Sequence, residues 1–262
     1  MKTRRRALRL LLAPAATVLC PSSQLFAAPA TPIVAAASDL NPVLDEIAQR
    51  FETETGRRLR LVFGSSGHLQ SQIRQGAPFE LFLCADEALV LALRNSGRTP
   101  DEGVVYGIGR LVLFAGVNSP IKTDGELKDL QAAARDGRLR RLALANPEHA
   151  PYGRAAKEVL VRLGLWDALQ GRLVFGENVV QAAQFAAMGA AEAALVALSL
   201  THAPRLREAG RHADVPQAWH TPLTQRMVRI QPYGETAAAF YAYLQTPAAR
   251  AMLTAYGFRM PD

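Results

Sequence analysis

The sequence predicts an α/β protein of two lobes, each a mainly parallel sheet flanked by helices, with the ligand in the cleft between them. Short apolar runs alternate with segments of helical spacing, which is typical of parallel sheets covered by helices on both faces. The 262 residues suffice for one large or two smaller domains. Glycine- and serine-containing loops follow two early apolar runs, and such sheets bind ligands beyond the carboxyl ends of their strands.

The first elements are expected between residues 33 and 95. Val43, Leu44, Ile47 and Phe51 recur at helical spacing, and Gly56 ends that helix. Apolar runs predict strands at 33–37, 59–63 and 79–83, and helices are expected after 42, after 66 and over 86–95.

The same alternation resumes after Gly107 and continues to the end of the chain. No pattern predicts an element between 201 and 222. Strands are expected at 110–117, 142–145, 173–175, 193–198 and 226–230, and helices at 125–134, after 153, after 179, at 237–244 and at 248–256.

Residues 1–30 resemble an export signal. Five basic residues precede the apolar stretch 10–19, which is too short to span a bilayer as a helix, and small residues around Ala28 and Ala30 offer a cleavage site.

The whole chain has a formal charge of +7, of which the leader contributes five, which leaves +2 for the mature chain. A nearly neutral chain without a basic stripe argues against nucleic-acid binding. We expect a periplasmic, monomeric protein.

Cysteine usage excludes two kinds of site. After removal of the leader, Cys84 is the only cysteine, so the mature chain can form neither an internal disulfide nor a thiolate metal cluster. Because Cys84 ends an apolar run, we interpret it as a small buried hydrophobic residue.

The loop Gly64-Ser65-Ser66-Gly67 between a strand and a helix predicts an anion site. Glycines allow a tight turn, and Ser66 is expected to cap the helix, where hydroxyls and free amides meet the positive end of the helix dipole. Ser38 lies at a similar junction. No lysine follows the loop, which argues against a phosphate-binding loop for nucleotides. The loop also departs by one residue from the G-x-S-x-G pattern of serine hydrolases.

Several motifs together resemble the periplasmic molybdate-binding proteins of ABC importers, which have the type II periplasmic binding protein fold. The resemblance covers nearly the whole mature chain, and its sharpest part is Asn-Pro-Glu-His-Ala-Pro at 146–151. It implies two lobes joined by two crossovers, without a cofactor or enzymatic activity, that capture molybdate or tungstate for a membrane permease. The implied domains are a signal peptide at 1–30, lobe I at 31–107 and 223–262, and lobe II at 108–222.

The resemblance also implies the ligand-binding residues. Ser38 and Ser66 of the first lobe would contribute hydroxyls and amides, and Tyr152 and Val179 of the second lobe would contribute backbone groups. These groups contact the oxyanion and are not direct metal ligands. Asp39 is expected to add an amide, with its carboxylate turned away from the dianion and capping its own helix.

One position departs from a well-known form of the family. Where that form has a ligand tyrosine, this chain has Ala197. We therefore expect the loop amides around Tyr152, with Val179, to supply the hydrogen-bond donors of the second lobe. We also expect the Tyr152 ring to cover the closed site.

Other interpretations are open to the sequence. A hydrolase would combine Ser66 with His68 or His149 and with Asp86, since such triads are recognised by geometry. A metal site is less favoured, because His202, His212 and His220 lack ligand spacing. A protein of the same fold could instead bind sulfate, phosphate or a small organic acid, the last paired with Arg154.

Overall fold

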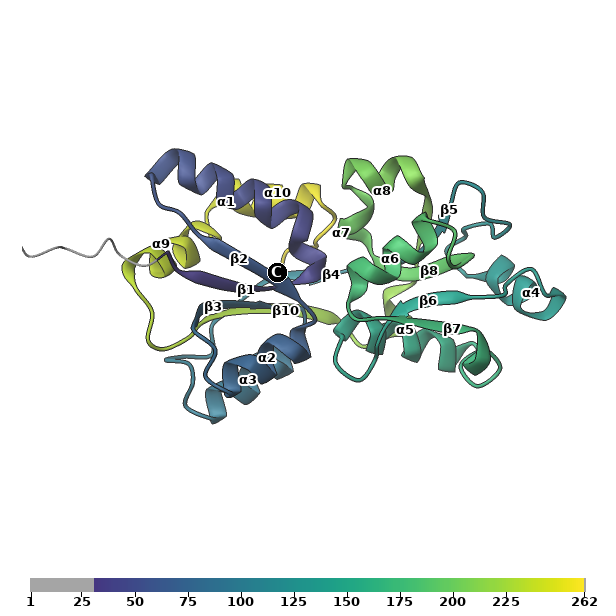
Figure 1. Ribbon diagram of the computed structural model, residues 1–262, viewed down its shortest axis with the longest axis horizontal. Helices are drawn as coiled ribbons and strands as arrows, with labels where there is room; N and C mark the ends of the chain where they lie inside the picture. The colour runs from purple at the N-terminus through teal and green to yellow at the C-terminus, as the bar shows by residue number, and fades with distance from the viewer. Residues whose placement is uncertain (1–30, 262) are drawn as a thin grey trace, which may run out of the picture. The chain divides into compact units, whose positions relative to one another are not determined.

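The computed structural model describes residues 31–261, which belong to one compact unit. The predicted signal peptide lies outside the described residues. No helix within 31–261 has the length and apolar character needed to cross a membrane. Two five-stranded sheets, each with its own helices, organise this part of the chain (Figure 1).

The first sheet, which with its helices we name lobe I, has the strand order β2-β1-β3-β10-β4. The strands β1, β2 and β3 are parallel, and β10 is antiparallel to β3 and β4. β1 is central and its sequence Ile-Val-Ala-Ala-Ala is almost wholly buried, as expected for a strand covered on both faces. The strands are β1 Ile33–Ala37, β2 Arg60–Gly64, β3 Phe79–Cys84, β4 Val104–Gly109 and β10 Leu223–Arg229.

Helices cover both faces of this sheet. In Figure 1, α1 and α10 lie above it and α2 and α3 below it. α1 buries Val43, Leu44, Ile47 and Phe51, the predicted apolar stripe, and it ends at Gly56, whose φ of 69° forms a left-handed cap. The helices are η1 Ser38–Leu40, α1 Asn41–Thr55, α2 Ser66–Arg74, α3 Glu87–Asn95, α9 Glu235–Tyr243 and α10 Pro247–Ala255.

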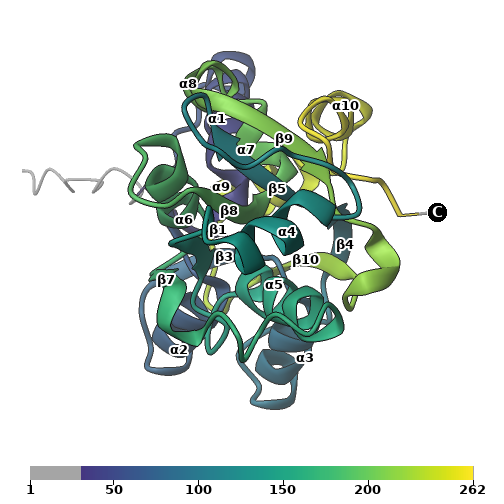
Figure 2. The ribbon, with the colours of Figure 1, turned by 90° about the vertical axis from the view of Figure 1, so that its right-hand side faces the viewer.

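The second sheet, with its helices, forms lobe II and has the order β7-β6-β8-β5-β9. β6 is parallel to β7 and β8, whereas β5 is antiparallel to β8 and to β9, the edge strand beside it in Figure 2. The strands are β5 Leu111–Gly116, β6 Leu142–Ala145, β7 Leu173–Gly176, β8 Ala193–Ala197 and β9 Gly210–Asp214.

The helices of lobe II enclose a single continuous apolar core. That core includes the buried strands β5, β6 and β8 and the inner faces of α5 and α6. The helices are α4 Lys128–Asp136, α5 Pro151–Arg162, η2 Gln170–Arg172, α6 Val179–Ala187, α7 Leu198–Thr201, α8 Pro204–Ala209 and η3 Gln217–Trp219.

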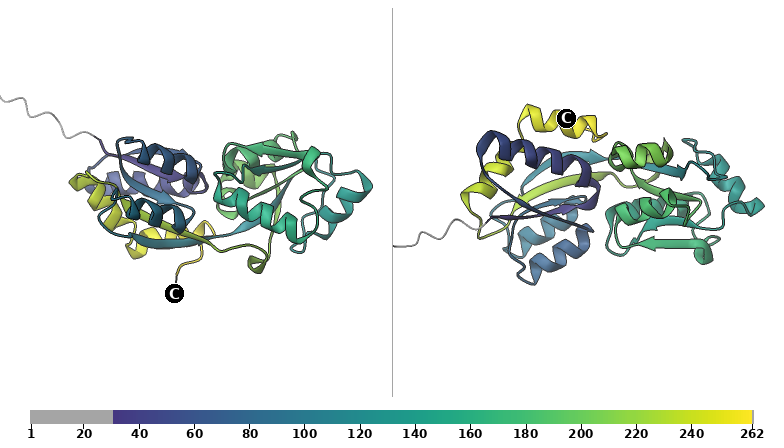
Figure 3. Two further views of the ribbon diagram at one scale, coloured as in Figure 1. Left: turned by 90° about the horizontal axis from the view of Figure 1, so that it is seen from below. Right: turned by 45° about the horizontal axis from the view of Figure 1, so that its top comes forward.

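The chain passes between the sheets twice. β4 continues through Arg110 into β5, and residues 215–222 return the chain to β10 (Figure 3). At this point the two crossing strands pair, with Leu223 opposite Gly109. These two segments, named the hinge here, connect the lobes side by side.

The structure adds two strands to the sequence prediction. β4 and β9 were not expected, because Val104–Gly109 contains two glycines and Gly210–Asp214 is mostly polar. Both occupy sheet edges, where a strand needs less apolar surface. β4 extends two residues beyond the predicted end of the first lobe segment at 107. The division of the chain at 107 and 222 stays a prediction.

Candidate functional site

The five residues predicted as ligand contacts, Ser38, Asp39, Ser66, Tyr152 and Val179, line one small cavity between the lobes. Both lobes contribute backbone and side chains to it, and among its lining residues there is no lysine, arginine or histidine. The lining consists of Ala37, Ser38, Asp39, Gly64, Ser65, Ser66, Ala85, Ala150, Pro151, Tyr152, Asn178 and Val179.

Four helical segments begin at this cavity. η1 begins at Ser38, α2 at Ser66, α5 at Pro151 and α6 at Val179. The amides of a first helical turn have no partner within the helix, and the positive end of the helix dipole lies there. The cavity therefore receives donors from both lobes without receiving a cation, which is a suitable environment for an anion.

Ser66 lies in the cavity wall, but it is not the cap of α2. Ser65 occupies the capping position, and Ser66 is the first helical residue. The prediction of a Ser66 cap was wrong because the turn ends one residue earlier. The Ser66 hydroxyl oxygen accepts the Ala85 amide at 3.0 Å. This bond fixes the side chain and leaves the hydroxyl hydrogen available to donate.

α6 presents its first amide to the cavity because of the residue before it. The Asn178 side chain accepts hydrogen bonds from the amides of Val180 and Gln181, at 3.0 and 3.2 Å. The Val179 amide is left without this partner. Asn178 was not among the predicted site residues, although an asparagine before an apolar helix is a recognisable capping signal.

Asp39 is 1% exposed. Its side chain was predicted to cap its own helix, but neither η1 nor α1 has a side-chain cap. One carboxylate oxygen accepts from Gln225 Nε2 at 2.6 Å, whereas the other has no partner among the described residues. Burial raises the pKa of Asp39 from 3.8 to about 6, although hydrogen bonds from Gln225 and Tyr152 oppose the shift. Asp39 does not cap its helix because Gln225, which is remote in sequence, donates a hydrogen bond to its carboxylate in the buried interior.

Tyr152 connects the cavity to the hinge. Its backbone lines the cavity, whereas its buried hydroxyl accepts from Gln225 at 3.3 Å and lies against Gly109. The hydroxyl end of the ring lies among the hinge strands. That the ring covers the closed site stays a prediction. Gln225 also accepts from the Tyr106 hydroxyl at 2.5 Å. The sequence contains no local signal for Gln225, because its hydrogen-bond partners Asp39, Tyr106 and Tyr152 come from three separate elements.

Two expected alternatives are not assembled. Ser65, not Ser66, contacts His149, with its hydroxyl oxygen 2.9 Å from Nδ1. Asp86 caps α3 and forms an ion pair at 2.7 Å with Arg154 across the lobes. Asp86 is therefore not a partner of a serine–histidine pair, and Arg154 is engaged by Asp86. Ala197 ends β8, is buried in the core of lobe II and does not line the cavity.

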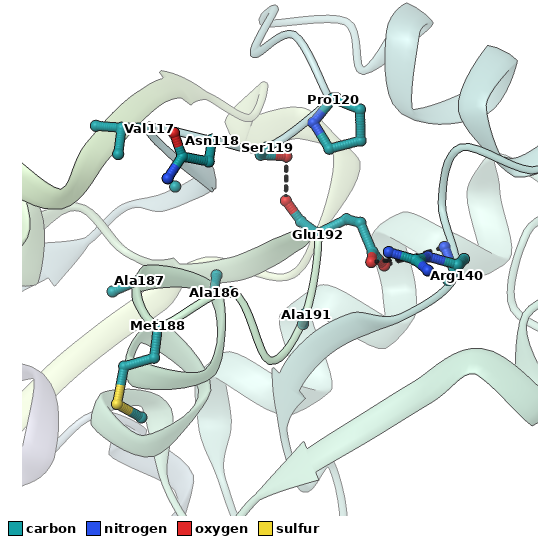
Figure 4. Close-up of a pocket in the computed structure, with 12 residues that line it drawn as sticks. Val117, Asn118, Ser119, Pro120, Arg140, Ala186, Ala187, Met188, Ala191 and Glu192 are labelled. Carbon is teal, nitrogen blue, oxygen red and sulfur yellow. Dashed lines mark hydrogen bonds and ion pairs between the residues drawn. The ribbon is translucent and has the colours of Figure 1, made fainter.

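A larger hollow of about 310 Å³ lies elsewhere on lobe II (Figure 4). Its main polar group is Glu192, which accepts the amides of Arg140 and Arg141, and whose backbone oxygen accepts from Ser119. These bonds satisfy Glu192 within the protein. The hollow differs from the interlobe cavity because a cationic side chain, Arg140, is among its lining residues.

Comparison with known proteins agrees with this architecture. The family model described as "Bacterial extracellular solute-binding protein" matches residues 33–259. The chain is 36% identical over 228 residues to the molybdate-binding protein ModA of Azotobacter vinelandii, covering 86% of this chain and 88% of the relative. It is 35% identical to ModA of Rhodobacter capsulatus, with coverages of 86% and 87%.

A solved structure gives the same result. The periplasmic molybdate-binding protein of Azotobacter vinelandii superimposes with a TM-score of 0.81 at 32% identity, covering 88% of this chain and all of that one. The two-lobed fold predicted from the sequence is confirmed. Since the family model spans nearly all of residues 31–261 and relatives exceed 30% identity, this chain belongs to the bacterial extracellular solute-binding proteins and, among them, to the ModA-like group.

Proposed function

We propose that this protein captures a tetrahedral oxyanion, molybdate or tungstate, outside the cytoplasm and delivers it to an ABC permease in the inner membrane. One observation carries the proposal: the interlobe cavity is lined by first-turn amides and by the Ser38 and Ser66 hydroxyls, without any cationic side chain. The molybdate-binding relatives support the choice of ligand. The proposed contacts are Ser38, Asp39, Ser66, Tyr152 and Val179.

Neutral donors are sufficient for tight binding. A hydrogen bond to a charged group contributes about 1.5–3 kcal/mol, so six such bonds give on the order of 10 kcal/mol before the costs of binding. Association costs several kcal/mol, and a surplus of about 8 kcal/mol corresponds to micromolar affinity. Because no counter-charge must be separated from the ligand, the anion can also be released to a permease.

The same geometry provides selectivity. Donors fixed at helix starts in two lobes fit one metal–oxygen length, and a smaller sulfate cannot reach all of them at once. A carboxylate ligand would need a bidentate cation, and Arg154, the arginine that the sequence suggested for this role, is paired with Asp86. We therefore favour molybdate or tungstate over sulfate, phosphate or an organic acid.

The proposed role is binding and transfer rather than catalysis. The family consists of solute-binding proteins, and the leader residues 1–30 are consistent with export to the periplasm. In this role the protein needs no cofactor and acts as a single chain that docks on its permease.

Isothermal titration calorimetry of the mature protein tests the proposal directly. Molybdate, tungstate, sulfate and phosphate are each titrated into ligand-free protein at the same ionic strength. We expect one site per chain with micromolar or tighter affinity for molybdate and tungstate, and at least about 100-fold weaker binding of sulfate. Since each 1.4 kcal/mol is tenfold, that ratio requires a difference of about 2.8 kcal/mol, or about one to two lost hydrogen bonds. Equal affinity for sulfate would contradict the proposal.

A further inference from the structure

Three side chains able to bind a metal gather next to the cavity, where the lobes meet. They are His68 of α2, His149 in the loop before α5, and Glu177 just before the cap of α6. One ligand atom of each lies within 4.8 Å of the other two. None of the three lines the oxyanion cavity, so the proposed function does not account for them.

The set is shared between the lobes. His68 belongs to lobe I, whereas His149 and Glu177 belong to lobe II. His68 Nδ1 lies 2.7 Å from a Glu177 carboxylate oxygen, and the two imidazole rings are stacked with centroids 3.8 Å apart. The three side chains therefore come together only while the lobes are in contact at this edge.

Hydrogen bonding prepares His149 to act as a ligand. The Ser65 hydroxyl donates to the His149 carbonyl oxygen at 2.7 Å, and the same hydroxyl oxygen lies 2.9 Å from His149 Nδ1. Since the hydroxyl has one hydrogen, His149 Nδ1 must donate to it, which leaves the lone pair of Nε2 free. A neutral imidazole oriented by a hydrogen bond at its other nitrogen is the usual form of a metal ligand.

We propose that His68, His149 and Glu177 bind a divalent transition-metal ion, with zinc as the reference ion, and that this ion holds the two lobes together. Two imidazoles and a carboxylate form a common zinc set, with water completing the coordination. Such a set also accepts copper and nickel, whereas the oxygen-preferring magnesium and calcium ions are disfavoured.

Metal binding requires only local movement. Zinc bonds of about 2.0–2.2 Å place two tetrahedral ligands roughly 3.4 Å apart, so the contact between His68 and Glu177 must widen from 2.7 Å. The two rings lie 24° from parallel, and His68 must tilt for both lone pairs to reach one ion. The side chains of His68 and Glu177 are 45% and 62% exposed, which leaves room for both changes.

The position of the site couples it to ligand binding. Ser66, Ala150 and Asn178, which line the cavity, lie within two residues of His68, His149 and Glu177 respectively. A dication here would favour the closed lobes and stand near the negative charge of the anion. If closure is common to both events, zinc must tighten oxyanion binding by the factor by which the oxyanion tightens zinc binding. This reciprocity rests on the proposed function.

The experiment titrates zinc chloride into untagged mature protein at pH 7.5, in a non-chelating buffer, with and without molybdate. His68→Asn removes the only ligand from lobe I, and His212→Asn removes an exposed histidine of β9 as a matched control. We expect one zinc site, weakened ~10-fold or more in His68→Asn and unchanged in His212→Asn. Saturating zinc should lower the molybdate Kd about fivefold or more, and molybdate should lower the zinc Kd equally.

The possible failures can be told apart. If molybdate does not bind at all, the proposed function is wrong, and the metal site is still judged by the difference between His68→Asn and the parent. Equal zinc affinity in those two proteins would overturn the metal site. A molybdate Kd that saturating zinc leaves unchanged, in a parent protein that binds zinc through His68, would overturn the coupling between the two sites.

Discussion

At the scale of single residues, the two serines of lobe I differ in how they are held. Ser66 is fully buried and its oxygen is fixed by the Ala85 amide at 3.0 Å, whereas Ser38 is 5% exposed at the start of η1. A fixed hydroxyl costs less to order when a ligand binds. In the proposed complex, both would supply a donor to the oxyanion.

Replacing either hydroxyl should weaken oxyanion binding. We expect Ser38→Ala and Ser66→Ala each to make the free energy of molybdate binding less favourable by about 1.5–3 kcal/mol, the range for a hydrogen bond to a charged group. Calorimetry measures the loss, and Ser96→Ala on the exposed end of α3 is the control. Unchanged affinity in both cavity variants would place the site elsewhere.

Asp39 makes stability depend on pH. Because its pKa is raised from 3.8 to about 6 by burial, the protonated form is favoured in the folded protein. Its contribution to stability is fully present below pH 4 and is lost as pH rises through 6. The shift corresponds to about 3 kcal/mol at most.

The variant Asp39→Asn should remove this dependence. Near pH 4 we expect the variant and the parent to have the same unfolding free energy. Near pH 7 the unfolding free energy of the variant should exceed that of the parent by as much as about 3 kcal/mol. Urea unfolding of the ligand-free proteins across this range measures it. Glu235→Gln, an exposed carboxylate of α9, should show no comparable trend. A constant difference at every pH would mean that Asp39 acts through shape rather than charge.

At the scale of elements, the start of α2 docks on the His149 loop. The Gly67 amide donates to the His149 carbonyl oxygen at 2.9 Å, and Ser65 donates to the same oxygen at 2.7 Å. A Cβ on Gly67 would lie 2.6 Å from that oxygen and 3.0 Å from the His149 Cα. Glycine is therefore required here by close approach between two lobes.

Gly67→Ala should hinder closure without harming α2. Alanine is favoured over glycine in a helix by about 1 kcal/mol, so unfolding stability should be maintained or slightly raised. The molybdate Kd should rise ~10-fold or more, because closing the lobes would force an overlap with backbone atoms. Calorimetry and thermal unfolding are compared with Gly171→Ala, where a Cβ meets no atom within 4 Å. Parental affinity in Gly67→Ala would show that this contact is absent from the bound form.

At the scale of the whole molecule, several interactions link the lobes. Outside the hinge, lobe I also contacts lobe II directly. Ser65 and Gly67 contact His149. Asp86 forms an ion pair with Arg154, and the Ser199 hydroxyl donates to the Asp39 carbonyl oxygen. Ligand binding in the cavity adds donors from both sides to this set. Binding and stability should therefore be linked.

Molybdate should stabilise the protein increasingly as its concentration rises above its Kd. A ligand at 100 times its Kd raises the unfolding free energy by about 2.7 kcal/mol, if it binds only the folded form. Thermal unfolding over a concentration series should show a rising Tm, and Ser66→Ala should require a higher concentration for the same rise. Sulfate at equal ionic strength is the control. An equal rise with sulfate would indicate a general salt effect.

The sequence by itself determined the fold class and most elements, and its resemblance to a known family indicated the ligand contacts Ser38, Asp39, Ser66, Tyr152 and Val179; the fold class, the elements and the Ser38 and Ser66 junctions need no such resemblance. These follow from local patterns: the apolar stripe of α1, the buried run of β1, and glycine–serine turns before helices. The edge strands β4 and β9 were not predicted, because strands at a sheet edge need little apolar surface. The Asn178 cap carried a local signal that could have been read.

Only the tertiary structure decided what depends on distant neighbours. Asp39 turns to Gln225 instead of capping its helix, and the Tyr152 hydroxyl reaches the hinge at Gly109. The meeting of His68 with His149 and Glu177 likewise depends on how two lobes face each other. Hydrogen bonds and burial join residues tens of positions or more apart in these cases, and neither propensity nor periodicity, which act within a few residues, contains that information.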